Sequence, residues 1–227
     1  GQGPRRLTSY LQAASQILEH PKAASFDKAK VVNTVLRYQD GGAAVAKEPE
    51  TLAAMSTEDE RKAFAAFYGN AFQIIVAKAY LLADNASSSR ISLDAYRAAG
   101  GALDADYSFT LGETLAKLGR DKEAYEAYLS AAVDNAKGAA VKALDLYKKL
   151  RGKEEGFLIE LENRSRQLPF KPQEFEAPAA WKGKAVLAEL FTGSECPPCV
   201  GADRGFDGLI EAYPAKYLVV PEYHLPI

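Results

Sequence analysis

The residues most suited to chemistry are two cysteines in the segment Cys196-Pro197-Pro198-Cys199. No other cysteine occurs among the 227 residues, so this spacing accounts for every thiol of the chain. A thiolate attacks a disulfide to form a mixed disulfide, and a second thiolate close by then displaces the reduced substrate. The two cysteines therefore predict reversible dithiol-disulfide exchange.

The residues around the cysteines predict a strand, a helix and a second strand. Residues 185–191 (AVLAELF) are a short apolar run typical of a buried strand, and residues 217–220 (YLVV) are a second candidate. Short joins between these elements predict a βαβ unit whose strands lie parallel. Pro214 would end the helix, whose expected apolar stripe consists of Ala202, Phe206, Leu209, Ile210 and Tyr213.

A helix that begins at the cysteines would assign each sulfur a role. Cys196 would lie at the helix N-terminus, where free N–H groups and the helix dipole favour the thiolate, so it is the expected nucleophile. Cys199, about one turn further along, is the expected resolving thiol. Pro197 and Pro198 fix φ in the first turn and cannot donate hydrogen bonds to the sulfurs, which should influence the reduction potential.

The segment from Lys182-Gly183-Lys184 through Phe191 to the two cysteines, followed by a helix, resembles the opening of a thioredoxin-like domain. It is most similar to the TlpA-like thiol-disulfide oxidoreductases with a CPPC centre, and the resemblance covers residues 181–227. It implies a thioredoxin fold and dithiol exchange at Cys196 and Cys199, with no cofactor beyond their redox-active disulfide. It also implies protein thiols or disulfides as substrates and an extracytoplasmic setting, periplasmic or secreted.

Two features differ from that family. Glu195 stands where such domains commonly carry Trp, and a carboxylate there would raise the pKa of the Cys196 thiol, opposing the helix terminus. A thioredoxin domain also needs roughly twice the available length, because its later strands and its cis-proline loop would follow Ile227. We therefore expect a C-terminally incomplete domain within a longer protein.

Residues 5–168 are patterned as helices throughout. Pro21 should end the first helix, and the Gly41-Gly42 pair should end a second helix over residues 26–38. The first helix would bury the stripe formed by Leu7, Leu11, Ala14 and Leu18.

A third helix is marked by a capping box of Thr57 and Glu60 and should extend to Asp84. Residues 85–89 are expected to form a loop, and Gly100-Gly101 should end a short helix over residues 93–99. The third helix would bury one largely apolar face made of Phe64, Phe67, Ala71, Ile74, Ile75, Lys78 and Leu82.

Residues 108–133 resemble one tetratricopeptide repeat, a helix-turn-helix unit. Ser108 and Ala136 depart from its usual Trp and Pro. Helices are also expected over residues 142–150 and 157–168, the latter with Phe157, Leu158, Leu161 and Leu168 on one face, and such hairpins must stack on neighbours to bury their apolar faces. The residues that match the repeat are Leu111, Gly112, Leu115, Gly119, Ala124, Tyr128 and Ala131.

The expected architecture is multidomain. An all-α, repeat-like domain spans residues 1–168, a proline-punctuated linker spans 169–184, and the α/β thioredoxin-like segment spans 185–227. The helical domain would bind a protein partner or position the redox module.

Charge and hydropathy exclude several classes of partner. The 28 Lys and Arg against 30 Asp and Glu give a net charge of -2, so no electrostatic affinity for nucleic acid or anionic membrane is expected. The most apolar stretch, residues 71–83, is too short to span a bilayer, so no transmembrane segment is expected. The opening GQGPRRL carries neither an initiator Met nor a leader, so any targeting peptide is expected to be absent from this sequence.

Three alternative interpretations use the same residues. The chain could be an interaction scaffold with a structural or vestigial dithiol, or the dithiol could sense redox state and switch the helical domain. The two sulfurs could instead bind zinc with His20 and His224. A cytoplasmic location also suits the cysteine count.

Overall fold

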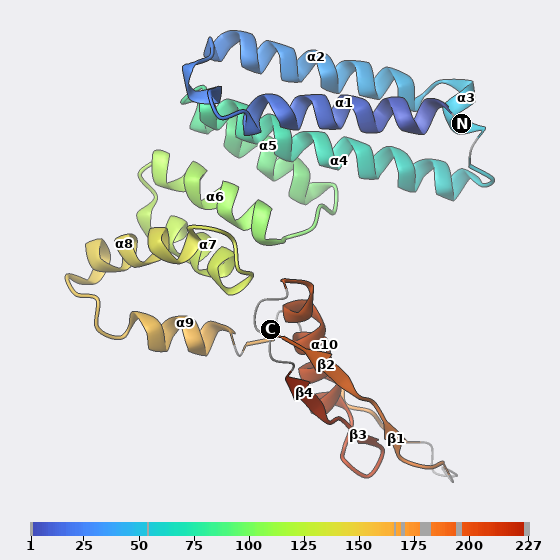
Figure 1. Ribbon diagram of the computed structural model, residues 1–227, viewed down its shortest axis with the longest axis vertical. Helices are drawn as coiled ribbons and strands as arrows, with labels where there is room; N and C mark the ends of the chain where they lie inside the picture. The colour runs from blue at the N-terminus through green and yellow to red at the C-terminus, as the bar shows by residue number, and fades with distance from the viewer. Residues whose placement is uncertain are drawn as a thin grey trace. The chain divides into compact units, whose positions relative to one another are not determined.

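The computed structural model describes residues 2–53, 55–165, 167–168, 171–177, 183–193 and 197–224, apart from the side chains of Gln2, residues 197–200 and His224. Most of this chain is helical, with a few short strands toward its C-terminal end (Figure 1). It divides into two compact units. Unit 1 comprises Gly1–Ala132 and Ala136–Glu154, and unit 2 comprises Val133–Asn135 and Glu155–Ile227.

Unit 1 consists of helices joined by short turns. The first predicted helix is confirmed, since α1 ends at Glu19 shortly before Pro21 and buries Leu7 and Ala14 completely. None of the helices within the described ranges is long and apolar enough to cross a bilayer. The elements are α1 (Gln2–Glu19), the 3-10 turn η1 (Ala23–Ser25), α2 (Lys28–Ala46), α3 (Pro49–Leu52), α4 (Glu58–Leu82), α5 (Ala86–Ala98), α6 (Ala105–Lys117), α7 (Asp121–Val133) and α8 (Ala139–Arg151).

Helix α4 is the central element of unit 1, because it is buried on two sides. The predicted single buried face was therefore wrong in part: Phe67 is 64% exposed, since the neighbouring helices cover other sides of α4. The cluster shared with α1 and α2 consists of Ala14, Val35, Phe72, Ile75, Val76 and Ala79. The cluster shared with α5 and α6 consists of Ala77, Leu93, Tyr96 and Tyr107.

The predicted helix stop at Gly41-Gly42 was wrong, because α2 continues through both glycines to Ala46. A Cβ at Gly41 would lie 2.8 Å from the Tyr10 ring, and a Cβ at Gly42 would lie 2.6 Å from the Phe72 ring. These glycines therefore let α1 and α4 approach α2 closely. The requirement for glycine at these positions comes from neighbouring helices, so it could not be predicted from the residue types alone.

Side chains cap the N-terminal ends of α4 and α5. The predicted capping box is confirmed at the start of α4, where Thr57 Oγ1 accepts from the Glu60 N–H and Glu60 Oε2 accepts from the Thr57 N–H. The predicted loop at residues 85–89 was wrong, because α5 begins at Ala86. The Asn85 side chain accepts from the Ser88 N–H and so satisfies a free N–H of its first turn.

Asp84, in the turn between α4 and α5, forms ion pairs with residues of α2 and α6. It adopts a left-handed backbone with φ of 56°. Its carboxylate pairs with Lys28 at the start of α2 and accepts from Lys117 Nζ at the end of α6, 2.7 Å away. The hydrogen bond from Lys117, followed by that from Lys28, lowers the pKa of the Asp84 carboxyl from 3.8 to about 2.

Asp84→Asn should lower the melting temperature at neutral pH, and the difference from the parent should vanish in acid. Because folding lowers the pKa of this carboxyl, the ion pairs stabilise unit 1 above pH 3.8 and stop doing so as the pH falls through about 2. Asparagine tolerates the left-handed backbone, so the variant removes only charge. Thermal melts from pH 7 to pH 2 test this, with the exposed Asp40→Asn as the matched control. A gap that persisted unchanged at pH 2 would contradict the ion-pair explanation.

Helices α6 and α7 form the predicted helix-turn-helix. Gly119 turns the chain with φ of 72°, and a Cβ at Gly112 would lie 2.6 Å from the Tyr128 ring, so the expected close approach is confirmed. The buried Tyr128 hydroxyl donates to Glu113 Oε1 at 2.7 Å, and Lys142 Nζ of α8 lies 3.0 Å from the same oxygen. Burial, followed by the Glu113 hydrogen bond, raises the pKa of Tyr128.

Unit 2 contains a parallel βαβ arrangement, as predicted. Its elements are α9 (Phe157–Ser165), β1 (Val186–Leu187), β2 (Leu190–Thr192), α10 (Pro197–Ala212), β3 (Leu218–Val219) and β4 (Glu222–His224). The expected strand at 185–191 is interrupted at residues 188–189, which separates β1 from β2. The chain that pairs with it is interrupted between β3 and β4. Two short parallel pairs result, β1 with β3 and β2 with β4. Within the predicted linker 169–184, residues 169–170 and 178–182 lie outside the described ranges.

The expected burial in unit 2 was wrong at several positions. Phe191 of the predicted buried strand is 58% exposed, and Ile210 of the predicted α10 stripe is 50% exposed. Leu158 of α9 is also exposed, although Phe157 is buried. A two-stranded sheet offers one narrow face to α10, so the apolar residues that face elsewhere have no cover among the described residues.

Candidate functional site

The two cysteines fall at the junction of β2 and α10. Strand β2 ends at Thr192, and α10 begins at Pro197. Cys196, which directly precedes the helix in sequence, lies outside the described residues. Cys199 is the third residue of α10, and Pro197 and Pro198 supply its first two positions. The described backbone thus agrees with the predicted order of a strand followed by a helix.

Strand pairing aligns the ends of β2 and β4. In the parallel register of these strands, Thr192 pairs with His224, so both strands end at the same edge of the sheet. The carboxyl ends of parallel strands are a common location for functional groups in α/β proteins. The backbone of His224 is therefore next to that of Thr192, the last residue of β2.

Strand β2 has one face toward α10 and one away from it. Leu190 and Thr192 are buried, and α10 packs against this strand. Phe191 lies on the opposite face of the strand from Leu190 and Thr192. Its ring stacks on that of Tyr223 with 4.9 Å between centroids. The sheet thus presents an exposed aromatic pair on the face away from α10.

Two buried polar atoms, one on β2 and one on α10, have no hydrogen-bond partner within the described part of the chain. They are Thr192 Oγ1, on a side chain that is 3% exposed, and Asp203 Oδ1 on α10. Buried polar atoms nearly always have a partner, so each such exception points to strain, water or function. Sequence reasoning missed both residues, because neither type nor spacing shows that an oxygen is buried.

The described part of the predicted linker is attached to α10. The Phe175 N–H donates to the Ala212 carbonyl at 2.7 Å, and the Phe175 ring stacks on Tyr213 with centroids 4.8 Å apart. Tyr217 contacts the same ring edge-on at 5.3 Å. Residues 171–177 have no regular secondary structure, yet Phe175 covers the end of the helix, a role that its irregular sequence pattern did not indicate.

The zinc alternative involves residues that are only partly described. His20 has local contacts: its Nδ1 accepts from the Lys22 N–H at 3.1 Å, and its ring lies against Phe26. Among the described side chains no group of three or more His, Cys, Asp or Glu is arranged to bind a metal. Cys196 and the side chains of Cys199 and His224 lie outside that set.

Unit 1 has a groove between α2, α4 and α5 that a partner could enter. Its volume is about 480 Å³. Its walls are mainly small side chains, and Gln39, Lys47 and Gln73 supply polar groups. A cavity of this size suits a small ligand or a short segment of another chain. The small lining residues include Ala43, Ala46, Ala66, Gly69 and Ala95.

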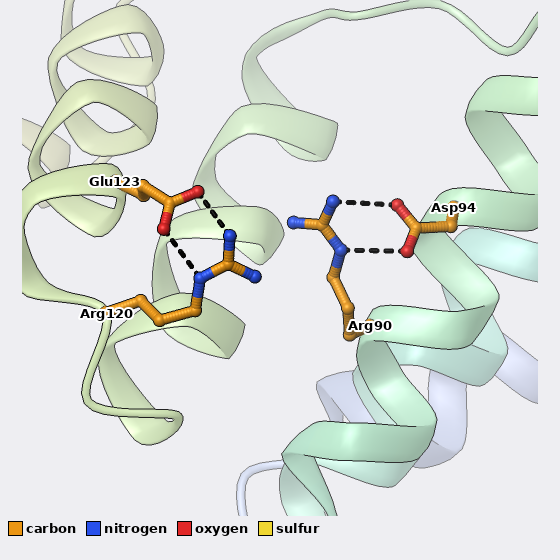
Figure 2. A network of polar contacts seen from close by, with 4 residues as sticks. All are labelled: Arg90, Asp94, Arg120 and Glu123. Carbon is orange, nitrogen blue, oxygen red and sulfur yellow. Dashed lines mark hydrogen bonds and ion pairs between the residues drawn. The ribbon is translucent and has the colours of Figure 1, made fainter.

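Two local ion pairs, one on α5 and one at the start of α7, form a cluster of four charged side chains. Arg90 forms two contacts of 2.9 Å with Asp94, and Arg120, just before α7, binds Glu123 in the same forked manner (Figure 2). The hydrogen bond from Arg90 to Asp94 mainly raises the pKa of Arg90, and Glu123 adds a smaller effect in the same direction. Both arginines are thus neutralised within unit 1, so this cluster does not favour an anionic partner.

These features locate one chemical candidate in unit 2 and one binding surface in unit 1. No known protein family, no curated protein and no solved structure matches this chain.

Proposed function

We propose that this chain is a thiol-disulfide oxidoreductase whose reacting groups are Cys196 and Cys199. The single observation that carries the proposal is that the CPPC segment follows β2 and that its last three residues begin α10. A thiol directly before a helix is exposed to the free N–H groups of the first turn, which favour its thiolate.

The proposed exchange is balanced in atoms and electrons. The Cys196 thiolate attacks a substrate disulfide, forming a mixed disulfide and releasing one substrate sulfur as a thiolate. Cys199 loses its proton, and its sulfur then attacks the Cys196 sulfur, which releases the second substrate sulfur and leaves a Cys196–Cys199 disulfide. The substrate gains two electrons and the protein dithiol loses two. The reverse sequence oxidises a substrate dithiol.

The surrounding fold supports this proposal in two respects. The parallel βαβ unit is compatible with part of a thioredoxin-like domain, and the stacked, exposed rings of Phe191 and Tyr223 offer an apolar sheet face that a substrate protein could contact. The α6–α7 hairpin is compatible with one repeat of a tetratricopeptide-like scaffold that holds a protein partner. An extracytoplasmic location belongs to the same proposal and rests on the family resemblance.

The pH dependence of thiol alkylation tests the proposal. The Cys199→Ser variant leaves Cys196 as its single thiol, and we expect its alkylation rate to reach half its maximum below the pH of about 8.5 that is typical of a free thiol. The Cys196→Ser variant isolates Cys199 as the matched control. Each variant unfolded in urea supplies the reference. A Cys196 that reacts at neutral pH no faster in the folded chain than in urea would contradict the proposal.

The groove between α2, α4 and α5 favours a second candidate, an interaction scaffold with a structural dithiol. Substituting Gly69, where an added Cβ has no atom within 4 Å, by Leu would fill the groove without overpacking the core. Loss of partner capture together with normal thiol reactivity would separate the binding role from the redox role.

A further inference from the structure

The charge of the groove between α2, α4 and α5 selects among the ligands that its size admits. Its volume of about 480 Å³ is within the range of small-molecule sites. Among the described residues that line the groove, Lys47 alone is charged, and none is acidic. The groove therefore presents one positive charge on an otherwise uncharged wall, which favours a ligand with a single negative charge.

The Lys47 charge is not neutralised within the described part of the chain. Glu48, the next residue, pairs with Arg6 of α1 at 2.6 Å. The amide of Asn70, which also lines the groove, donates to the Ala99 carbonyl at 3.0 Å and so links α4 to α5. Lys47 has no ion pair and no side-chain hydrogen bond with any described residue. Its ammonium group is thus available to an anion bound in the groove.

The helices place this charge at one end of the groove. Helices α2 and α4 lie side by side and run in opposite directions (Figure 1). They touch at Gly42, where a Cβ would lie 2.6 Å from the Phe72 ring. The amides of Gln39 and Gln73 lie toward one side of this contact, whereas Lys47 follows Gln39 by eight residues, about 12 Å along α2. A long, narrow ligand with its charge at one end matches this arrangement.

The wall between these ends is smooth and apolar. It includes the small residues Ala43, Ala66, Gly69 and Ala95. A glycine weakens the interior of a helix relative to alanine, yet an added Cβ at Gly69 would meet no atom within 4 Å, so packing inside unit 1 does not require this glycine. Gly69 instead keeps the groove open. Such a wall can bury an unbranched hydrocarbon chain, which is stabilised by the removal of its apolar surface from water.

We propose that this groove binds an anionic amphiphile, namely a carboxylate at the end of an unbranched hydrocarbon chain of medium length. The carboxylate pairs with the Lys47 ammonium group, and the chain lies along the small residues of α4 and α5. This site is separate from the dithiol of unit 2 and does not depend on the proposed oxidoreductase function.

Isothermal titration calorimetry of the full chain with decanoate, kept below its critical micelle concentration, tests the proposal. We expect saturable binding of one decanoate per chain. Decyltrimethylammonium has the same hydrocarbon chain and the opposite charge, and we expect it to bind about tenfold more weakly. High salt should narrow this difference, because it screens an exposed ion pair.

Three variants locate the site. Lys47→Glu should reverse the preference, so that decyltrimethylammonium binds more tightly than decanoate. Lys30→Glu changes another exposed lysine of α2 that does not line the groove, and as the matched control it should keep the preference of the parent. Gly69→Leu fills the groove and should weaken the binding of both probes at least about tenfold. Helical circular dichroism checks that each variant is folded, and Lys47→Gln, which should bind both probes equally, replaces a Lys47→Glu that does not fold.

The contrary outcomes are distinct. A folded parent that shows no saturable binding of decanoate overturns the proposal and leaves the groove to a protein partner. A preference for decanoate that persists in Lys47→Glu overturns the role of Lys47. Undiminished binding by Gly69→Leu shows that the amphiphile binds elsewhere and overturns the site. Thiol alkylation tests the proposed function separately, so either proposal can fail without the other.

Discussion

Cys196→Ser is expected to reduce the rate of disulfide exchange by at least about a thousandfold, because a serine hydroxyl cannot form a mixed disulfide. Cys199→Ser has a different expected result. The first attack still occurs, but no second sulfur releases the substrate, so the protein accumulates as a mixed disulfide. The pair of variants therefore distinguishes the nucleophile from the resolving thiol.

The measurement is exchange with a disulfide-bonded peptide, followed by the mass of the intact protein under acid quench. The mass should rise by one peptide thiol in Cys199→Ser and should remain unchanged in Cys196→Ser. Full exchange by Cys196→Ser would refute the assigned roles. Equal trapping by both single variants would show that the two thiols are equivalent, which the position of Cys196 directly before α10 does not predict.

Tyr128→Ala is expected to lower the free energy of unfolding by about 4 kcal/mol, because it removes a large, fully buried ring between α6 and α7. The ring lies where a Cβ at Gly112 would reach 2.6 Å, and it also contacts Phe109 edge-on with centroids 5.6 Å apart. With a glycine facing it, the cavity cannot be filled by a neighbouring side chain. Urea unfolding monitored by helical circular dichroism measures the change.

Tyr128→Phe is the matched control. It keeps the ring and removes only the hydrogen bond to Glu113, which retains its contact with Lys142. We expect a loss of about 1 kcal/mol. If both variants were equally destabilised, the hydroxyl would matter more than packing, and the close approach at Gly112 would not explain the hairpin.

Local sequence signals predicted the structure correctly where a residue's role depends only on its neighbours in the sequence. The Thr57–Glu60 capping box and the turn at Gly119 were predicted correctly, because capping and left-handed backbone depend on residues close in sequence. The order strand, helix, strand and its parallel pairing followed from periodicity and short connections. The identities of Cys196 and Cys199 as candidate reacting groups likewise needed only their spacing, and their chemistry stays a prediction.

What the sequence could not determine is which of several uses a residue serves. A Gly-Gly pair such as Gly41-Gly42 is typical of a helix end. Both glycines nevertheless lie within α2, where the rings of Tyr10 and Phe72 pack against them. The burial of Asp203 Oδ1, which has no hydrogen-bond partner among the described residues, likewise could not be predicted from residue type or spacing. Sequence alone thus determined the elements and the thiol spacing, whereas tertiary structure decided burial and close approach, because both depend on neighbours distant along the chain.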